Sequence, residues 1–146
     1  MQYKEHGVLR EKIIDDTILE ILVIQQANGF HIHVSDGELD HTLSEFKTSY
    51  PYYYQEAVKQ IGVDALRKNL KDRALFSKVK NYVLENELLI DDVTVQEFIC
   101  ENKLESHLSK YSFNQLRELL SKDLQEFAFQ KWMTSLKQNA NIVFCN

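Results

Sequence analysis

Three stretches of the chain carry the same signal for the start of an α-helix. In each, a Ser or Thr is followed three residues later by Glu or Gln, and apolar residues flank the motif. The pairs are Ser35 with Glu38, Thr94 with Glu97, and Ser112 with Gln115. This is the spacing of a capping box with a hydrophobic staple, in which side chains bond to backbone N–H groups that a helix start leaves unpaired. The sequence therefore predicts helices that begin near residues 35, 94 and 112.

The spacing of apolar residues extends these starts into long helices. Apolar residues recur at steps of three and four, the period of one helix face. The predicted helices cover residues 4–27, 35–49, 63–83, 94–103 and 112–139, with a further short helix between Pro51 and Gly62. We expect the first helix to be heavily buried and to stop at Asn28-Gly29. The last is expected to run without interruption for about 40 Å.

Composition agrees with an ordered, helix-rich protein. Of 146 residues, 44% are hydrophobic and 27% charged, with one Pro and four Gly, which suits a single packed domain. We expect one domain over residues 1–146, with an N-terminal part at 1–103 and a returning helix and strand at 112–145. Residues 141–145 suit a short strand, and 30–34 is its best partner. The predicted fold class is mainly α, with five to six helices and this small two-stranded β element.

Charge and hydropathy exclude several classes of protein. The net charge of −5 argues against a nucleic-acid binder, because phosphate affinity needs concentrated Lys and Arg. The longest apolar stretch, 18–24, contains Glu20, so no membrane span is expected. The opening residues lack the apolar core of a signal peptide, which favours a cytoplasmic location. A periplasmic or other extracytoplasmic location stays open, because a cleaved leader would leave the same sequence.

Local signatures of catalysis are absent from the sequence. There is no Gly-rich phosphate loop, GxSxG, HExxH or CxxC pattern. His31, His33 and His41 lie within eleven positions, and in an extended segment the first two would point to the same side. No Cys or carboxylate stands at a recognised ligand spacing beside them, so we expect no metal, no cofactor and no catalytic residues. A metal protein built on these histidines remains the weaker alternative.

The only proline is surrounded by tyrosines. Tyr50, Tyr52, Tyr53 and Tyr54 flank Pro51, and helices joined by short turns cannot bury every such ring. An exposed aromatic surface suits binding of apolar or extended polypeptide. Partial burial of these rings in the core is the alternative.

The order of the pieces resembles a known family. The runs "EKIIDDTILEILVIQQANGFHIHVSDGELDHTLSEF", "ALRKNLKDRALFSKVKNYV" and "VTVQEFICENK" resemble the N-terminal chaperone domain of SurA-like proteins, a family that includes relatives attached to parvulin-type prolyl isomerases. In that family a long helix ends in a short extended segment, and the next helix opens with a pattern like Val34–Leu39. The stretch "FQKWMTSLKQNANIVF" is similar to the family's last helix and strand.

The resemblance implies a helper protein that holds unfolded or extended polypeptide in a groove between helices, without a cofactor. Parvulin-bearing members insert a domain where this chain has only eight residues, between Lys103 and Ser112, so no prolyl isomerase activity is expected. The candidate contact residues are aromatic side chains prone to exposure. They are Tyr50, Tyr52, Tyr53, Tyr54, Phe76, Phe113 and Trp132.

Two further expectations concern partners. A dedicated adaptor that binds one partner protein or one precursor peptide, in a modification or secretion pathway, is the alternative to a general chaperone. A long terminal helix that returns onto an early core invites exchange between copies, so a domain-swapped homodimer is predicted.

Overall fold

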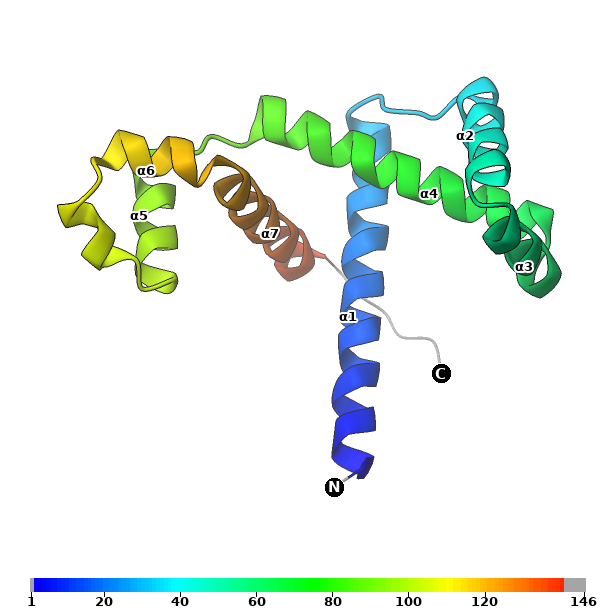
Figure 1. Cartoon of the computed structure of the whole chain (residues 1–146), viewed down its shortest axis with the longest axis horizontal. Coiled ribbons are helices and arrows are strands. Elements are labelled where there is room, and N and C mark those ends of the chain that lie inside the picture. Colours follow the sequence, from blue (N-terminus) through cyan, green and yellow to red (C-terminus); the bar gives the residue numbers. More distant parts are fainter. Residues whose placement is uncertain (1, 141–146) are drawn as a thin grey trace. The chain divides into compact units, whose positions relative to one another are not determined.

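The computed structural model describes residues 2–140, and this part of the chain is helical. Its seven α-helices are α1 (Gln2–Gly29), α2 (Asp36–Ser49), α3 (Pro51–Ile61), α4 (Val63–Tyr82), α5 (Asp92–Glu101), α6 (Phe113–Leu119) and α7 (Ser121–Asn139), with a π-helix η1 (Val83–Glu87) and a 3₁₀ helix η2 (Glu105–Ser109) (Figure 1). The prediction of a mainly α fold is confirmed.

The predicted β element is not found where it can be checked. Phe30 and His31 form a turn and residues 32–35 are irregular, so residues 30–34 are not a strand. The proposed partner, 141–145, lies outside the described residues. His31 explains part of the difference, because its φ of 57° is left-handed and ends α1 in a tight turn, with Ile32 N–H donating to the carbonyl of Ala27 at 2.9 Å.

The chain divides into two compact units. One is continuous, residues 20–80, and holds the end of α1, then α2, α3 and nearly all of α4. The other combines the first part of the chain, up to residue 19, with residues from 81 onward. We call them the continuous unit and the discontinuous unit.

In the continuous unit, Ser35 starts α2 as predicted. Its side chain accepts a hydrogen bond from Glu38 N–H at 3.1 Å. The Glu38 carboxylate contacts Lys78 of α4 at 2.5 Å, and the same Lys78 ammonium donates to the carbonyl of His33 at 3.0 Å. Lys78 therefore ties α4 both to the segment before α2 and to the first turn of α2.

A second ion pair joins the same two helices. Arg67 of α4 contacts Asp40 at 2.5 Å and Asp36 at 3.7 Å. Leu39 lies between Asp36 and Asp40 in the sequence, and its side chain is buried. Leu66 of α4 is also buried. Each helix thus has a buried leucine next in sequence to a residue of this charge pair, since Leu39 precedes Asp40 and Leu66 precedes Arg67.

The core of the discontinuous unit lies among α5, α6 and α7 (Figure 1). Val95, Ile99, Leu116 and Leu124 form its buried centre. Half-buried apolar residues surround that centre: Ile90, Phe98, Leu104, Tyr111, Phe113 and Leu120.

Ser112 caps α6 with a complete capping box, because Gln115 N–H donates to its hydroxyl at 3.2 Å and Ser112 N–H donates to the Gln115 side chain at 2.8 Å. The predicted start of this helix is confirmed.

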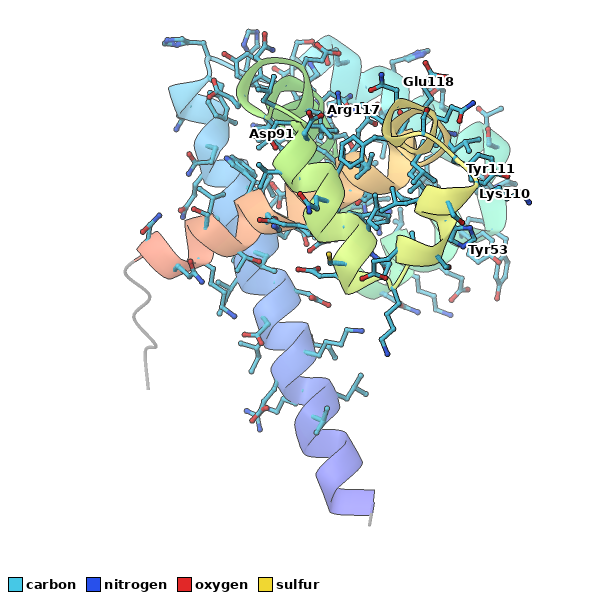
Figure 2. All side chains as sticks on the ribbon, turned by 90° about the vertical axis from the view of Figure 1, so that its left-hand side faces the viewer. Tyr53, Asp91, Lys110, Tyr111, Arg117 and Glu118 are labelled. Carbon is cyan, nitrogen blue, oxygen red and sulfur yellow. The ribbon has the colours of Figure 1, made fainter. Side chains whose placement is uncertain are left out.

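The predicted start of α5 at Thr94 is wrong by three residues. Asp91 is the N-cap, and its carboxylate accepts hydrogen bonds from the backbone N–H of Thr94 at 2.9 Å and from its hydroxyl at 2.8 Å. Arg117 of α6 lies beside Asp91 at this helix start (Figure 2). The guanidinium of Arg117 pairs with Asp92. Asp91 and Thr94 are both possible N-cap residues. Asp91 is the N-cap in the structure, because an Asp carboxylate caps a helix at least as well as a Thr hydroxyl and its negative charge is favourable at a helix N-terminus.

The long C-terminal helix predicted over 112–139 is two helices. Leu120 has φ −100° and ψ 14°, which breaks the helical path between α6 and α7. The break lets both segments contribute to one core, because Leu116 of α6 and Leu124 of α7 belong to the same buried cluster. Apolar packing around α5 therefore overrides a periodicity that is compatible with one straight helix.

The first helix is less buried than predicted. Val8, Leu9 and Ile13 are each more than half exposed, and within the described side chains only Val23 and Ala27 of α1 are buried. Apolar residues occur on every side of α1, as the run from Ile18 to Ile24 shows, so one packed face cannot cover them all. In the discontinuous unit, Asp15 of α1 pairs with Lys137 of α7 at 2.9 Å.

Candidate functional site

Five aromatic residues gather where α2 turns into α3. Pro51 occupies the first position of α3, where its missing N–H removes no helical hydrogen bond. Tyr50 ends α2 and precedes α3, with φ −135° and ψ 62°. The chain therefore reverses within one residue and brings both helix ends together. We call the resulting group the tyrosine cluster: Phe46, Tyr50, Tyr52, Tyr53 and Tyr54.

The rings of the tyrosine cluster contact one another largely edge to face. Phe46 lies 6.2 Å from both Tyr50 and Tyr54 between ring centres, and Tyr53 lies 6.4 Å from Tyr50 and 5.7 Å from Tyr52. These separations are typical of favourable aromatic pairs. The cluster is thus a connected aromatic surface in which each ring helps to position the next.

Three of these rings are open to solvent. Tyr50, Tyr52 and Tyr53 are 57%, 68% and 64% exposed, whereas Tyr54 is half-buried beneath the ammonium of Lys47 at 5.6 Å. A contiguous exposed aromatic patch is a usual mark of an interaction surface. A tyrosine side chain has only two torsions, so it loses little conformational entropy when it binds an apolar side chain. Its hydroxyl keeps the exposed ring compatible with water.

The other predicted contact residues lie apart from this cluster in sequence and element. Phe76 is half-buried on α4 of the continuous unit. Phe113 and Trp132 belong to the discontinuous unit, where Phe113 packs on the α5–α6–α7 core and Trp132 stacks on Phe129 at 5.6 Å. The structure therefore groups the four tyrosines and adds Phe46, which the sequence analysis missed although it lies one helical turn before Tyr50.

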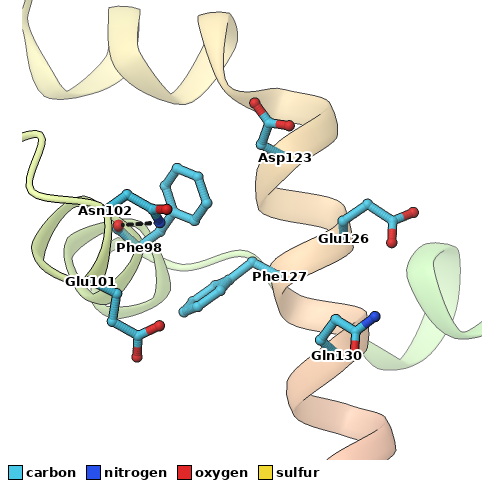
Figure 3. A pocket seen from close by; sticks show the side chains of 7 residues that line it. All are labelled: Phe98, Glu101, Asn102, Asp123, Glu126, Phe127 and Gln130. Atoms are coloured by element: carbon cyan, nitrogen blue, oxygen red, sulfur yellow. Dashed lines mark hydrogen bonds between the residues drawn. The ribbon is translucent and has the colours of Figure 1, made fainter. Parts of the chain in front are cut away.

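A hollow between α5 and α7 is a second surface feature, in the discontinuous unit. Its volume is about 600 Å³, and Figure 3 shows its lining residues: Phe98, Glu101, Asn102, Asp123, Glu126, Phe127 and Gln130. A neighbouring hollow of about 530 Å³ shares Glu101, Phe127 and Gln130 and extends along α7 to Gln138. We call the two together the α5–α7 groove. Sequence reasoning missed it, because its walls are more than twenty residues apart along the chain.

Ionisable groups with shifted pKa values belong to the fold and lie outside both surfaces. The hydrogen bond from Lys78 lowers the pKa of Glu38, and hydrogen bonds from Thr94 lower the pKa of Asp91. The bond to Asp40 raises the pKa of Arg67. Each shift comes from a helix start or a surface ion pair, so each reports on stability.

The Lys78 contact predicts an acid-dependent loss of stability. A carboxyl whose pKa is lower in the folded state stabilises the fold above its ordinary pKa of 4.5, and this contribution is lost as the pH falls through the lowered value. We expect Lys78→Met to be less stable than the parent protein at neutral pH and to lose less stability on acidification. Thermal unfolding followed by circular dichroism from neutral pH to below the pKa of Glu38 measures both effects.

Lys71→Met is the matched control for this prediction. It removes the same charge from an exposed position of α4 and should leave the acid dependence as in the parent protein. Parallel pH profiles for Lys78→Met and the parent protein would contradict the assignment.

The three clustered histidines have different local surroundings in the structure. His31 occupies the turn after α1, the carbonyl of His33 accepts from Lys78, and His41 on α2 pairs with Glu45 at 3.3 Å. Among the residues that the structure describes, no three His, Cys, Asp or Glu side chains are placed to hold a metal ion. Between residues 2 and 140, no helix has both the length and the apolar character needed to cross a bilayer.

The chain is similar to proteins named Chaperone SurA. It is 29% identical over 118 residues to that of Buchnera aphidicola subsp. Schizaphis graminum, which covers 73% of this chain and 27% of that protein. A second Buchnera aphidicola protein, from subsp. Acyrthosiphon pisum, is 23% identical over 82% of this chain and 26% of its own length. That of Hahella chejuensis is 25% identical over 64% of this chain and 23% of its own length.

These matches span about a quarter of the length of the curated relatives. No family model matches the chain, and no solved structure matches it. The similarity supports a relationship to SurA-like chaperones. The eight residues between Lys103 and Ser112 contain η2 and connect α5 to α6.

Proposed function

We propose that this protein binds unfolded or extended polypeptide in the manner of a chaperone, without catalysing a covalent step. The observation that carries the proposal is the tyrosine cluster, which presents three neighbouring exposed rings at one turn. The similarity to chaperones supports it independently. Such a surface gains affinity from burial of apolar area, which places few demands on the sequence of the bound chain.

An aggregation assay with the full chain tests this function. A chemically denatured client is diluted into buffer with and without this protein, and light scattering is followed. We expect scattering to fall as the ratio of protein to client rises, and fluorescence anisotropy to show binding of a labelled unfolded polypeptide. A protein that neither lowers scattering nor binds such a polypeptide would refute the proposal.

The same assays separate a general chaperone from a dedicated adaptor. An adaptor would leave client aggregation unchanged and would bind one partner or one precursor peptide tightly. We favour general binding, because the exposed tyrosines supply apolar area with few directional groups. The seven aromatic residues named from the sequence remain the proposed contacts, with Tyr50, Tyr52 and Tyr53 as the principal ones.

We further propose that a second copy of the chain covers α1. Val8, Leu9 and Ile13 leave a large aliphatic area exposed. Arg10 and Lys12 come before Ile13 in the sequence, and Asp16 and Glu20 come after it. An antiparallel pair of α1 helices would set the basic residues of one copy against the acidic residues of the other. The proposed homodimer thus buries the apolar residues of α1 between charge pairs, and the exchange of the terminal helix between copies stays a prediction.

Light scattering of purified protein tests the dimer. We expect the mass of two chains for the parent protein and of one chain for the double variant Leu9→Ser, Ile13→Ser. Leu89→Ser, which alters an exposed residue outside α1, should leave the dimer intact. A monomeric parent protein at high concentration would disprove the pairing.

A further inference from the structure

The α5–α7 groove combines an aromatic floor with acidic edges. Phe98 and Phe127 meet edge to face, with ring centres 5.4 Å apart and planes at 75°. Glu101 at the end of α5 and Asp123 near the start of α7 are exposed at its edges. Within residues 2–140, no ion pair involves either of these two carboxylates. The groove therefore offers apolar area and negative charge to the same ligand.

The ring of Phe127 already holds a positive charge from the chain itself. The ammonium of Lys131 lies 4.7 Å from the ring centre and pairs with Glu97 of α5. Such cation–π contacts arise from the negative face of the ring and strengthen as water is displaced. Figure 3 shows the Phe127 ring extending from α7 toward Glu101 on α5. A cation at Glu101 would lie near the Phe127 ring and also near Lys131, whose charge is offset by its pairing with Glu97.

We propose that the α5–α7 groove binds a Lys or Arg side chain of an extended polypeptide. The alkyl stem of such a side chain packs on Phe98 and Phe127, while its charged end lies at Glu101 and Asp123. The net charge of −5 favours approach of a basic segment over an acidic one. This inference rests on the proposed function for the nature of the ligand and adds a preference for positive charge.

Two labelled peptides that differ only in charge test the inference. Both carry the same aromatic residues, and one has lysine where the other has the uncharged isostere norleucine. In fluorescence anisotropy at low ionic strength, we expect the lysine peptide to bind at least about tenfold more tightly, which corresponds to about 1.4 kcal/mol. Added salt should reduce this ratio, since exposed charges are screened.

Variants of the full chain locate the effect. Glu101→Gln with Asp123→Asn should reduce the ratio to near one. The control double variant, Glu105→Gln with Glu118→Gln, removes the same net charge from exposed positions in the same unit and should keep the ratio. Phe127→Leu keeps the floor apolar without the aromatic face, so it should lower the preference for lysine while norleucine-peptide binding persists.

The outcomes distinguish this inference from the proposed function. Equal binding of both peptides, or an equal loss of preference in the control variant, would overturn the groove assignment and leave polypeptide binding intact. If neither peptide binds, both the groove assignment and the proposed polypeptide binding are refuted. Retention of the lysine preference in the Glu101–Asp123 double variant would place the selectivity elsewhere and refute the groove.

Discussion

Replacing Tyr50, Tyr52 and Tyr53 together with serine is expected to lower the affinity for an unfolded polypeptide by at least tenfold, about 1.4 kcal/mol. These rings supply most of the exposed aromatic area of the tyrosine cluster, and serine keeps a hydroxyl while removing the apolar body. Because the three side chains are exposed, the thermal unfolding midpoint should change little. Fluorescence anisotropy with a labelled polypeptide measures the affinity.

A second triple variant controls for general loss of hydrophobicity. Leu89, Leu108 and Leu119 are exposed leucines of the discontinuous unit, and their replacement by serine removes apolar area far from the turn between α2 and α3 in sequence. This variant should bind like the parent protein. An equal loss of affinity in both triple variants would mean that binding depends on the total exposed apolar area. It would contradict the assignment of the tyrosine cluster as the principal binding surface.

Leu124→Ala is expected to destabilise the discontinuous unit by about 3 kcal/mol, within the usual range for removing a fully buried leucine side chain. Leu124 is completely buried and contacts the cluster built on Val95, Ile99 and Leu116. The loss combines reduced apolar burial with a cavity that α5 and α6 only partly fill. Urea denaturation followed by circular dichroism measures the change in free energy of unfolding.

Leu119→Ala is the matched control for this substitution. Leu119 lies five residues away, at the end of α6, and is about two-thirds exposed, so the same chemical change should cost less than about 0.5 kcal/mol. Similar losses for the two variants would contradict the placement of the core between α5, α6 and α7.

Local signals in the sequence predicted much of the helix pattern. Ser35 and Ser112 start helices as expected, because a cap depends on contacts within four residues. Pro51 and Gly62 bound α3 for equally local reasons, one at its first position and the other at a φ of 83° after its end. The four tyrosines beside Pro51 were named for a similar reason, since they lie near one turn of the chain, whereas Phe46 was missed.

Features that depend on tertiary contacts were missed or wrong. The break at Leu120 allows α6 and α7 to pack with α5 in one core. The spacing of apolar residues within 112–139 does not predict this packing. Apolar residues on α1 predicted burial, but burial needs neighbours that the periodic pattern does not identify. The α5–α7 groove joins Glu101 to Phe127 across the whole of η2 and α6, so its charge and aromatic character become visible only when the two helices are side by side.

The pairing of Asp15 with Lys137 links residues 122 positions apart, whereas residues 20–80 form a unit from one unbroken segment. On a ribosome, the continuous unit can therefore complete its contacts before α7 has been made. The ion pair between α1 and α7 must wait until α7 is synthesised. Closing so long a loop is slow relative to local helix packing, so we expect the discontinuous unit to form after the continuous unit, with the exposed aliphatic residues of α1 open to aggregation throughout synthesis.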